Sequence, residues 1–161
     1  HVPLKNVNRY ITKSSLIETI QIINKDLKKK FKIDNPKILV TGLNPHAGED
    51  GLLGNEDENI IKHVIKTMRK KHIKVDGPIP ADTAFIKKNI KEYDIILTMY
   101  HDQGLPVIKF NNFKKTVNVT LGLPIIRVSV DHGTALDLVG TGKIDTSSFL
   151  EAIKVAKSIS G

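Results

Sequence analysis

Cysteine and tryptophan are absent from the 161-residue sequence, and aromatic residues make up only 5% of it. Without cysteine the chain forms no disulfide and offers no thiolate, so any metal must be held by His, Asp or Glu. No apolar run approaches the length that spans a bilayer, and no signal peptide is visible, so we expect no membrane partner.

Basic residues outnumber acidic residues by 25 to 17, which gives a formal net charge of +8. A charge of this sign can indicate a nucleic-acid partner, whose binding would depend steeply on salt. The excess, however, comes from scattered lysines in short runs such as 28–30 and 70–71. No aromatic residue is interleaved with these runs as a stacking platform would require. They are more typical of solvated helix faces, and we expect no nucleic-acid partner.

The sequence begins at His1, within a proline-containing segment, rather than at Met. Its length and its hydrophobic fraction of 40% are sufficient for one domain or slightly more. We therefore expect a piece of a longer protein, in which part of a site lies elsewhere.

Segments with helical and with strand-like patterns alternate along the chain. Helical spacing of apolar residues predicts helices over about 15–31, 56–72, 82–91 and 146–159. A capping-box pattern at Ser15-Leu16-Ile17-Glu18 is expected to start the first helix. Short apolar runs predict strands at 37–41, 93–99, 116–121 and 125–130. The alternation predicts a layered α/β fold with a largely parallel sheet.

Two histidines directly follow predicted strands, His46 after 37–41 and His101 after 93–99. The carboxyl ends of neighbouring parallel strands meet at one edge of a sheet, so these imidazoles can converge. Converging neutral imidazoles suit a catalytic divalent ion such as Zn²⁺, which polarises a substrate oxygen. A single buried, hydrogen-bonded histidine at a strand end is an equally good explanation of His101 on these residues alone.

Two further groups of residues suggest ligand binding. The first is the polar and cationic set of Lys109, Asn118 and Arg127. Arg127 falls inside an apolar run, where an unpaired charge would cost several kcal/mol, so we expect it to meet a protein carboxylate or an anionic substrate. The second is the glycine-containing loop 131–143, in which small residues allow close approach to a phosphate or an adenosine and Asp137 can accept ribose hydroxyls. A plain surface loop explains it as well.

Five motifs in order resemble one family, the 4-hydroxythreonine-4-phosphate dehydrogenases of pyridoxal phosphate biosynthesis. They are VTGLNPHAGE (40–49), GPIPADT (77–83), MYHDQGLP (99–106), VNVTLGLP (117–124) and DHGTA (131–135). The resemblance runs from residue 1 to about 150, and the chain looks like the carboxyl-terminal half of the family. It implies a partial α/β fold similar to isocitrate and isopropylmalate dehydrogenases, with a metal-binding and dimerisation domain at 1–105 and substrate and cofactor loops at 106–161.

The resemblance also implies a set of site residues. The metal ligands correspond to His1, His46 and His101, in a site shared across a cytoplasmic homodimer. The substrate contacts correspond to Lys109, Asn118 and Arg127. The NAD contacts correspond to His132, Gly133, Thr134, Ala135 and Asp137. Asp102 and Lys109 are the expected catalytic residues, Asp102 by orienting the neighbouring imidazole or relaying a proton.

The implied reaction is oxidation of 4-phosphooxy-L-threonine by NAD, or NADP, followed by loss of CO₂ to give 3-amino-2-oxopropyl phosphate. A divalent ion (Zn²⁺, Co²⁺ or Mg²⁺) would lower the pKa of the substrate hydroxyl. The family's absent half carries a His-Thr pair that also holds the substrate, so the isolated chain is expected to be nearly inactive. Two alternatives stay open: a related dehydrogenase of another phosphorylated hydroxy acid, such as threonate 4-phosphate, or of a cyclic diol, and a non-catalytic dimerisation or binding fragment.

Overall fold

The computed structural model describes residues 2–134 and 136–161. These form two compact units, and the boundary lies between Val107 and Ile108, inside helix α6 (His101–Asn112). The expected boundary after residue 105 is close by, while the functional roles expected of the two parts stay predictions. Within the described ranges, no helix has both the length and the apolar character needed to cross a membrane.

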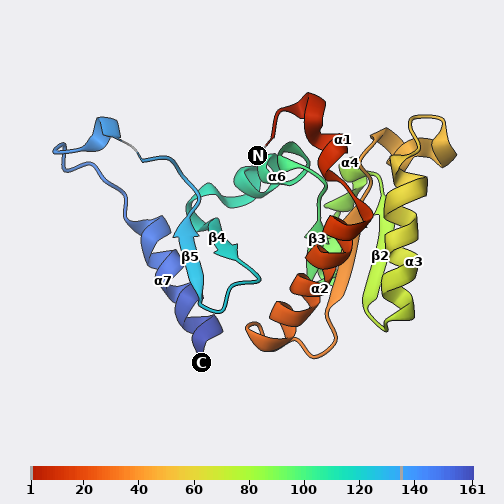
Figure 1. Ribbon diagram of the computed structural model, residues 1–161. Coiled ribbons are helices and arrows are strands. Elements are labelled where there is room, and N and C mark those ends of the chain that lie inside the picture. Colours follow the sequence, from red (N-terminus) through yellow and green to blue (C-terminus); the bar gives the residue numbers. More distant parts are fainter. Residues whose placement is uncertain (1, 135) are drawn as a thin grey trace. The chain divides into compact units, whose positions relative to one another are not determined.

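The first unit is built on a three-stranded parallel sheet (Figure 1). Its central strand is β1 (Lys37–Thr41), which pairs with β2 (Lys74–Ile79) on one side and with β3 (Ile95–Leu97) on the other. All but the first residue of β1 are buried. The predictions of a parallel sheet and of neighbouring strands at 37–41 and 93–99 are therefore confirmed.

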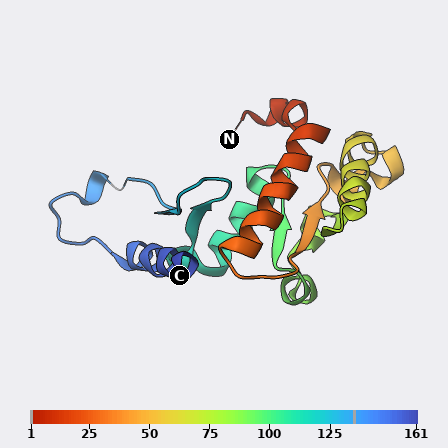
Figure 2. The same cartoon turned by 60° about the horizontal axis from the view of Figure 1, so that its bottom comes forward.

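Helices cover both faces of this sheet. On one face α2 (Lys13–Lys29) contacts α3 (His63–Lys70), which continues a π-helical turn over Asp57–Lys62. The crossover from β2 back to β3 contains α4 (Ala81–Ala84) and α5 (Lys87–Glu92), and Figure 2 shows α5 on the other side of the strands from α2. The two crossovers run in opposite directions along the sheet, so a right-handed connection places their helices on opposite faces. The core is formed by fully buried side chains, among them Ile20, Ile38, Val40, Ile61, Val64 and Met68.

The first long helix starts earlier than the sequence pattern indicates. Its N-cap is Thr12, whose Oγ1 accepts a hydrogen bond from the Ser15 backbone N–H at 3.2 Å, while the Thr12 N–H donates to Ser15 Oγ at 3.2 Å. The expected box at Ser15–Glu18 is therefore wrong, because the Thr12–Ser15 pair already satisfies the helix start. Upstream lie a 3₁₀ turn at Leu4–Asn6 and the short helix α1 (Val7–Tyr10).

Like the short helix α1, strand β2 and helix α6 have no counterpart among the predicted elements. Strand β2 contains Gly77-Pro78, which interrupts the apolar pattern, and it lies at an edge of the sheet, where proline is tolerated. Helix α6 contains Gly104 and Pro106, two residues that normally indicate a turn. Packing of the surrounding residues outweighs local propensity in both cases.

The second unit is an antiparallel hairpin covered by a helix. Strands β4 (Val117–Thr120) and β5 (Arg127–Val130) pair with Asn118 opposite Ser129 and Thr120 opposite Arg127. Helix α7 (Ser147–Ser160) packs on both strands. Short 3₁₀ turns occur at Phe113–Lys115 and Leu136–Leu138. The strands and the helix expected at 116–121, 125–130 and 146–159 are all present, with ends shifted by one or two residues.

Candidate functional site

The carboxyl ends of all three parallel strands border one cavity of about 470 Å³. The segment after β1 contributes Asn44 and His46, the segment after β2 contributes Asp82, and the segment after β3 contributes Tyr100 and Asp102. This is the edge at which open α/β sheets place their ligands. His46 thus lies where the sequence predicts a functional histidine.

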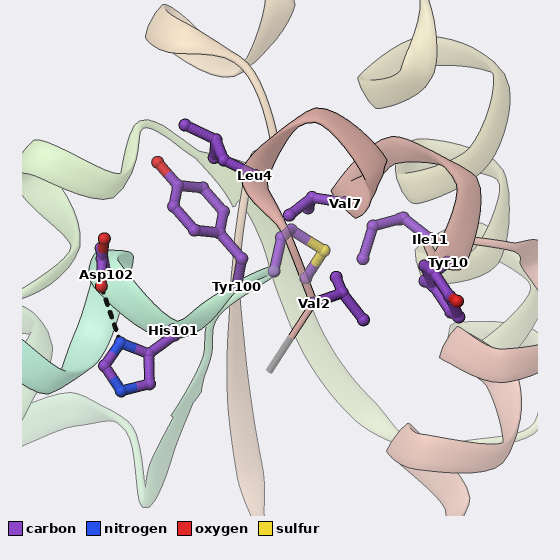
Figure 3. A pocket seen from close by; sticks show the side chains of 9 residues that line it. Val2, Leu4, Val7, Tyr10, Ile11, Tyr100, His101 and Asp102 are labelled. Carbon is purple, nitrogen blue, oxygen red and sulfur yellow. Dashed lines mark hydrogen bonds and ion pairs between the residues drawn. The ribbon is translucent and has the colours of Figure 1, made fainter.

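A second cavity, of about 430 Å³, is bordered by His101 (Figure 3). Tyr100 and Asp102 line both cavities, so His46 and His101 belong to adjoining spaces that share two residues. The remaining lining of the second cavity is mostly apolar and comes from Val2, Leu4, Val7, Tyr10, Ile11 and Met99. His101 therefore lies next to an apolar wall, while His46 lies among polar groups.

The His101 ring is hydrogen-bonded to its neighbour Asp102, with Nδ1 and Oδ1 separated by 2.6 Å (Figure 3). Both side chains are accessible, His101 at 46% and Asp102 at 77%, so the alternative of a buried structural histidine is wrong. An ionised carboxylate beside Nδ1 holds the proton there and directs metal coordination to Nε2. The pair has the form that metal-binding histidines commonly take.

His46 lies at the start of a left-handed turn (Pro45–Gly51). His46, Ala47, Glu49 and Asp50 all have φ between 44° and 53°. A left-handed conformation costs a non-glycine residue about 1–2 kcal/mol. Several such residues in succession persist only where surrounding contacts hold them, and such strain occurs preferentially at functional sites.

The two residues before this turn are held by Asp57, a buried carboxylate in the π-helical turn. Its Oδ1 accepts from the Leu43 N–H at 2.8 Å, and its Oδ2 accepts from the N–H and the side-chain amide of Asn44, both at 3.1 Å. Glu56 accepts a further bond from the Asn44 amide at 2.9 Å. Asp57 thus fixes the segment that leads into His46.

Replacing Asp57 with alanine is expected to lower the free energy of unfolding by about 3 kcal/mol, because at least two backbone N–H groups lose their acceptor in a buried place. The transition temperature of a chain this size would fall by about 10 °C, which differential scanning calorimetry can measure. Glu58→Ala is the matched control, since Glu58 only pairs with Lys62 on the surface and should change stability by less than about 1 kcal/mol. Equal effects of the two variants would contradict the role given to Asp57.

The three-histidine metal set is only partly described. His1 lies outside the described residues, and within those residues no group of three His, Cys, Asp or Glu side chains is placed to hold a metal ion. His46 and His101 remain the described members of the set. Their chemistry fits a divalent ion, because both are accessible imidazoles and His101 already has the carboxylate that supports a metal ligand.

In the second unit, Lys109 interacts with Asp131 and Phe113. Its Nζ lies 3.4 Å from Asp131 Oδ2 and 5.8 Å from the centre of the Phe113 ring. The Oδ2 atom is itself buried and has no hydrogen bond, so the contact with Lys109 is an ion pair with poor hydrogen-bond geometry. Lys109 therefore carries a charge that Asp131 offsets in part.

Asn118 and Arg127 lie on the same polar face of the hairpin, because Asn118 and Thr120 are two residues apart and Thr120 is opposite Arg127. Arg127 is exposed and donates from Nη1 to Thr120 Oγ1 at 2.8 Å. The expectation that it is buried in the strand is wrong: it is the first residue of β5, and the apolar residues before it are exposed too. No carboxylate pairs with it in the described part of the chain.

The loop expected to bind NAD is open to solvent. His132, Gly133, Thr134 and Asp137 are exposed, and His132 Nδ1 donates to the Gly133 carbonyl at 2.9 Å. Ala135, the remaining residue of that set, lies outside the described residues. The exposure of the described loop residues does not by itself identify a nucleotide as their ligand.

Comparison with known proteins identifies the family. The sequence matches the family described as "Pyridoxal phosphate biosynthetic protein PdxA" over residues 1–156. The chain belongs to the PdxA family. The resemblance in the sequence motifs is thereby confirmed.

Individual PdxA relatives are about twice as long as this chain. A 4-hydroxythreonine-4-phosphate dehydrogenase of Marinobacter nauticus is 53% identical over 159 residues, which are 99% of this chain and 47% of the relative. A crystal structure of the Klebsiella pneumoniae 4-hydroxythreonine-4-phosphate dehydrogenase is 37% identical, with a TM-score of 0.89, and the match covers 100% of this chain and 49% of that one. The expectation of a partial dehydrogenase fold is confirmed.

A third relative has a different substrate in its name. The terephthalate 1,2-cis-dihydrodiol dehydrogenase of Burkholderia xenovorans is 27% identical with a TM-score of 0.78, over 98% of this chain and 50% of that one. The same half-fold thus occurs in an enzyme named for a cyclic diol.

Sequence reasoning missed Asp57 and Gln103, two residues whose side chains hold the segments around the candidate histidines. Asp57 bonds to the segment that leads to His46, and Gln103 bonds to that segment and to the one that leads to His101. Gln103 lies inside the motif MYHDQGLP (99–106), so the motif could have drawn attention to it. Asp57 is one acidic residue among several in 56–58, and no pattern distinguishes it.

Proposed function

We propose that this chain is the carboxyl-terminal half of a 4-hydroxythreonine-4-phosphate dehydrogenase, which oxidises and decarboxylates 4-phosphooxy-L-threonine in pyridoxal phosphate biosynthesis. The observation that carries the proposal is the placement of His46 and His101 at the ends of two neighbouring parallel strands, in adjoining cavities that share Asp102. Membership of the PdxA family supports it.

The first unit would supply the metal ligands His46 and His101, with His1 as the third. A divalent ion (Zn²⁺, Co²⁺ or Mg²⁺) bound there would lower the pKa of the substrate hydroxyl, and NAD or NADP would accept the hydride from the carbon that bears this hydroxyl. Asp102 keeps the proton of His101 on Nδ1 and so presents Nε2 as the ligand atom. His46 is held for the same task by the turn that Asp57 fixes.

The second unit would hold the anionic parts of the ligands. Lys109 and Arg127 offset phosphate and carboxylate charge, and Asn118 adds a directional hydrogen bond from the same hairpin face as Arg127. Lys109 is also the candidate catalytic cation of this unit. The exposed loop residues His132–Thr134 and Asp137 would contact the nucleotide.

The whole enzyme would be a cytoplasmic homodimer whose active site is shared between subunits. The substrate is a small phosphorylated amino acid, and no nucleic-acid or membrane partner is part of the proposal. Because the relatives are about twice as long, this chain would need the other half of the protein for turnover.

A second candidate function is oxidation of a substrate without an amino group, such as threonate 4-phosphate or a cyclic diol, which the Burkholderia relative favours. The cavity next to His46 bears on the choice. Asp82 and Asp102 both line it, and a pair of carboxylates attracts the ammonium group of 4-phosphooxy-L-threonine, which threonate 4-phosphate and a cyclic diol lack. The electrostatics therefore favour the amino-acid substrate.

The test joins this chain to the amino-terminal half of the Marinobacter nauticus relative and measures NADH formation with the three substrates. We expect kcat/KM for 4-phosphooxy-L-threonine to exceed that for threonate 4-phosphate by about fivefold, because an ion pair with exposed carboxylates contributes up to about 1 kcal/mol. Asp82→Asn should reduce this ratio, and Asp50→Asn, which alters a carboxylate outside the cavity, should not. Preference for either of the other substrates would overturn the assignment.

A further inference from the structure

One side-chain amide connects the two segments that lead to His46 and His101. Gln103, in the first turn of α6, accepts through Oε1 from the Met99 N–H at 2.8 Å and from Thr41 Oγ1 at 3.0 Å. Its Nε2 donates to the Gly42 carbonyl at 2.8 Å, with a longer contact of 3.5 Å to the Leu43 carbonyl. Both ends of the amide are therefore in use.

These partners belong to the two separate segments that lead to His46 and to His101. Thr41 ends β1 and Gly42 begins the segment that reaches His46, whereas Met99 lies two residues before His101. Thr41 is fully buried and Met99 nearly so. Gln103 thus joins the carboxyl ends of β1 and β3 beyond the last residues of their ladder, Val40 and Leu97.

Only a primary amide of this length provides the contacts. A glutamate would still accept from Met99 and Thr41, but its second oxygen would face the Gly42 carbonyl and repel it. A methionine would fill the same space with no hydrogen bond, leaving the Met99 N–H without this acceptor. The two substitutions therefore separate the accepting from the donating half of the contact.

We infer that Gln103 is a positioning residue that sets the spacing of His46 and His101 by tying their two segments to one side chain. The inference rests on the proposed function in so far as these histidines bind a metal. It predicts a selective effect: loss of the tie should disturb the two histidines more than it disturbs the rest of the unit.

Asp94 offers a matched control on the same two strands. At the amino ends of β1 and β3, Asp94 Oδ2 accepts from the Lys37 N–H at 2.8 Å. The Asp94 N–H donates to the Lys37 carbonyl at 3.0 Å. Asp94→Ala removes a side-chain tie between β1 and the segment before β3, at the opposite end of the sheet from the cavity. If the loss of any side-chain contact between these strands were enough to loosen the first unit, Asp94→Ala should disturb the two histidines as much as Gln103→Met does.

The first measurement follows the histidine ring resonances of the metal-free chain by NMR. Gln103→Met should shift the ring signals of His46 and His101 while leaving those of His63 and His72, which lie on and after α3, unchanged. Asp94→Ala should leave His46 and His101 unchanged. The inference is overturned if Gln103→Met moves neither His46 nor His101, or if Asp94→Ala moves them equally.

The second measurement is Co²⁺ titration of the 161-residue chain, followed in the visible spectrum. Removal of a group that supports metal ligands typically weakens binding 10–100-fold, so we expect at least a tenfold loss for Gln103→Met, a smaller loss for Gln103→Glu, and less than twofold for Asp94→Ala. Unchanged affinity in both Gln103 variants would overturn the inference. If the unaltered chain binds no Co²⁺ while the ring signals shift as expected, the proposed metal function fails and the positioning role stands.

Discussion

Replacing either His46 or His101 with alanine is expected to weaken Co²⁺ binding by the chain at least about 100-fold, because each change would remove one of the three proposed ligands and metal affinity depends on the full set. In the protein joined to the other half of a relative, NADH formation should fall by about 10³-fold or more, since the proposed ion would supply the main stabilisation of charge on the substrate oxygen. Isothermal titration with Co²⁺ and steady-state kinetics with 4-phosphooxy-L-threonine measure the two effects.

The control for this prediction is His63→Ala. His63 is an exposed histidine on α3, away from both cavities, so its removal should leave affinity and turnover within about twofold. Neither His46→Ala nor His101→Ala should lower the melting temperature by more than about 2 °C, because both side chains are accessible and fill no core space. Retention of full Co²⁺ affinity by His46→Ala or His101→Ala would contradict their role as ligands.

The placement of these two histidines was predictable from the sequence, and the reason is local. The run 37–41 is apolar and β-branched, the run 93–99 is similar, and a polar segment with a histidine follows each. Strands of this kind pair in parallel in an α/β chain, so their carboxyl ends meet. The pairing of β1 with β3 confirms that step, which needed only the pattern and a rule of topology.

The supports of the histidines were not predictable, because they depend on contacts between residues far apart in the chain. Gln103 bonds to Gly42, and Asp57 bonds to Leu43, across separations that no local pattern encodes. Helix α6 was missed for a related reason. A Cβ at Gly104 would lie 3.2 Å from Thr98 Oγ1, a tight contact, so the glycine there reflects close packing rather than a turn.

Arg127 shows the opposite error, in which a sound physical rule was applied to a wrong premise. An unpaired charge inside an apolar strand would be costly, but the strand begins at Arg127 and its side chain is exposed. Ile125 and Ile126, the two residues before it, are exposed as well. Apolar sequence therefore did not mean burial in the second unit. The relatives of this chain are about twice as long as the chain itself.

The largest expected loss of stability comes from Gly77→Ala. Gly77 has φ of +120°, and a Cβ there would lie 2.3 Å from the Val40 carbonyl oxygen in the central strand. The pairing of β1 with β2 is irregular at this point, between Leu39 and Thr41, and the glycine allows the close approach. Backbone strain and a clash with immovable backbone combine, so we expect the free energy of unfolding to fall by more than about 4 kcal/mol.

Three further glycines separate these two contributions. Gly140 has φ of +75° and open space where a Cβ would lie, so Gly140→Ala should cost about 1–2 kcal/mol from conformation alone. Gly42 lacks the unusual φ, but its Cβ would lie 2.6 Å from Ala47 Cα and 2.7 Å from Asp57 Oδ1, so Gly42→Ala isolates the clash and should also weaken Co²⁺ binding through the His46 turn. Gly133 has neither feature, and Gly133→Ala should change stability by less than about 0.5 kcal/mol. Urea denaturation of the four variants should therefore rank Gly77→Ala as the most damaging and Gly133→Ala as the least, and a loss for Gly77→Ala no greater than that for Gly140→Ala would show that β2 can move away from Val40 at little cost.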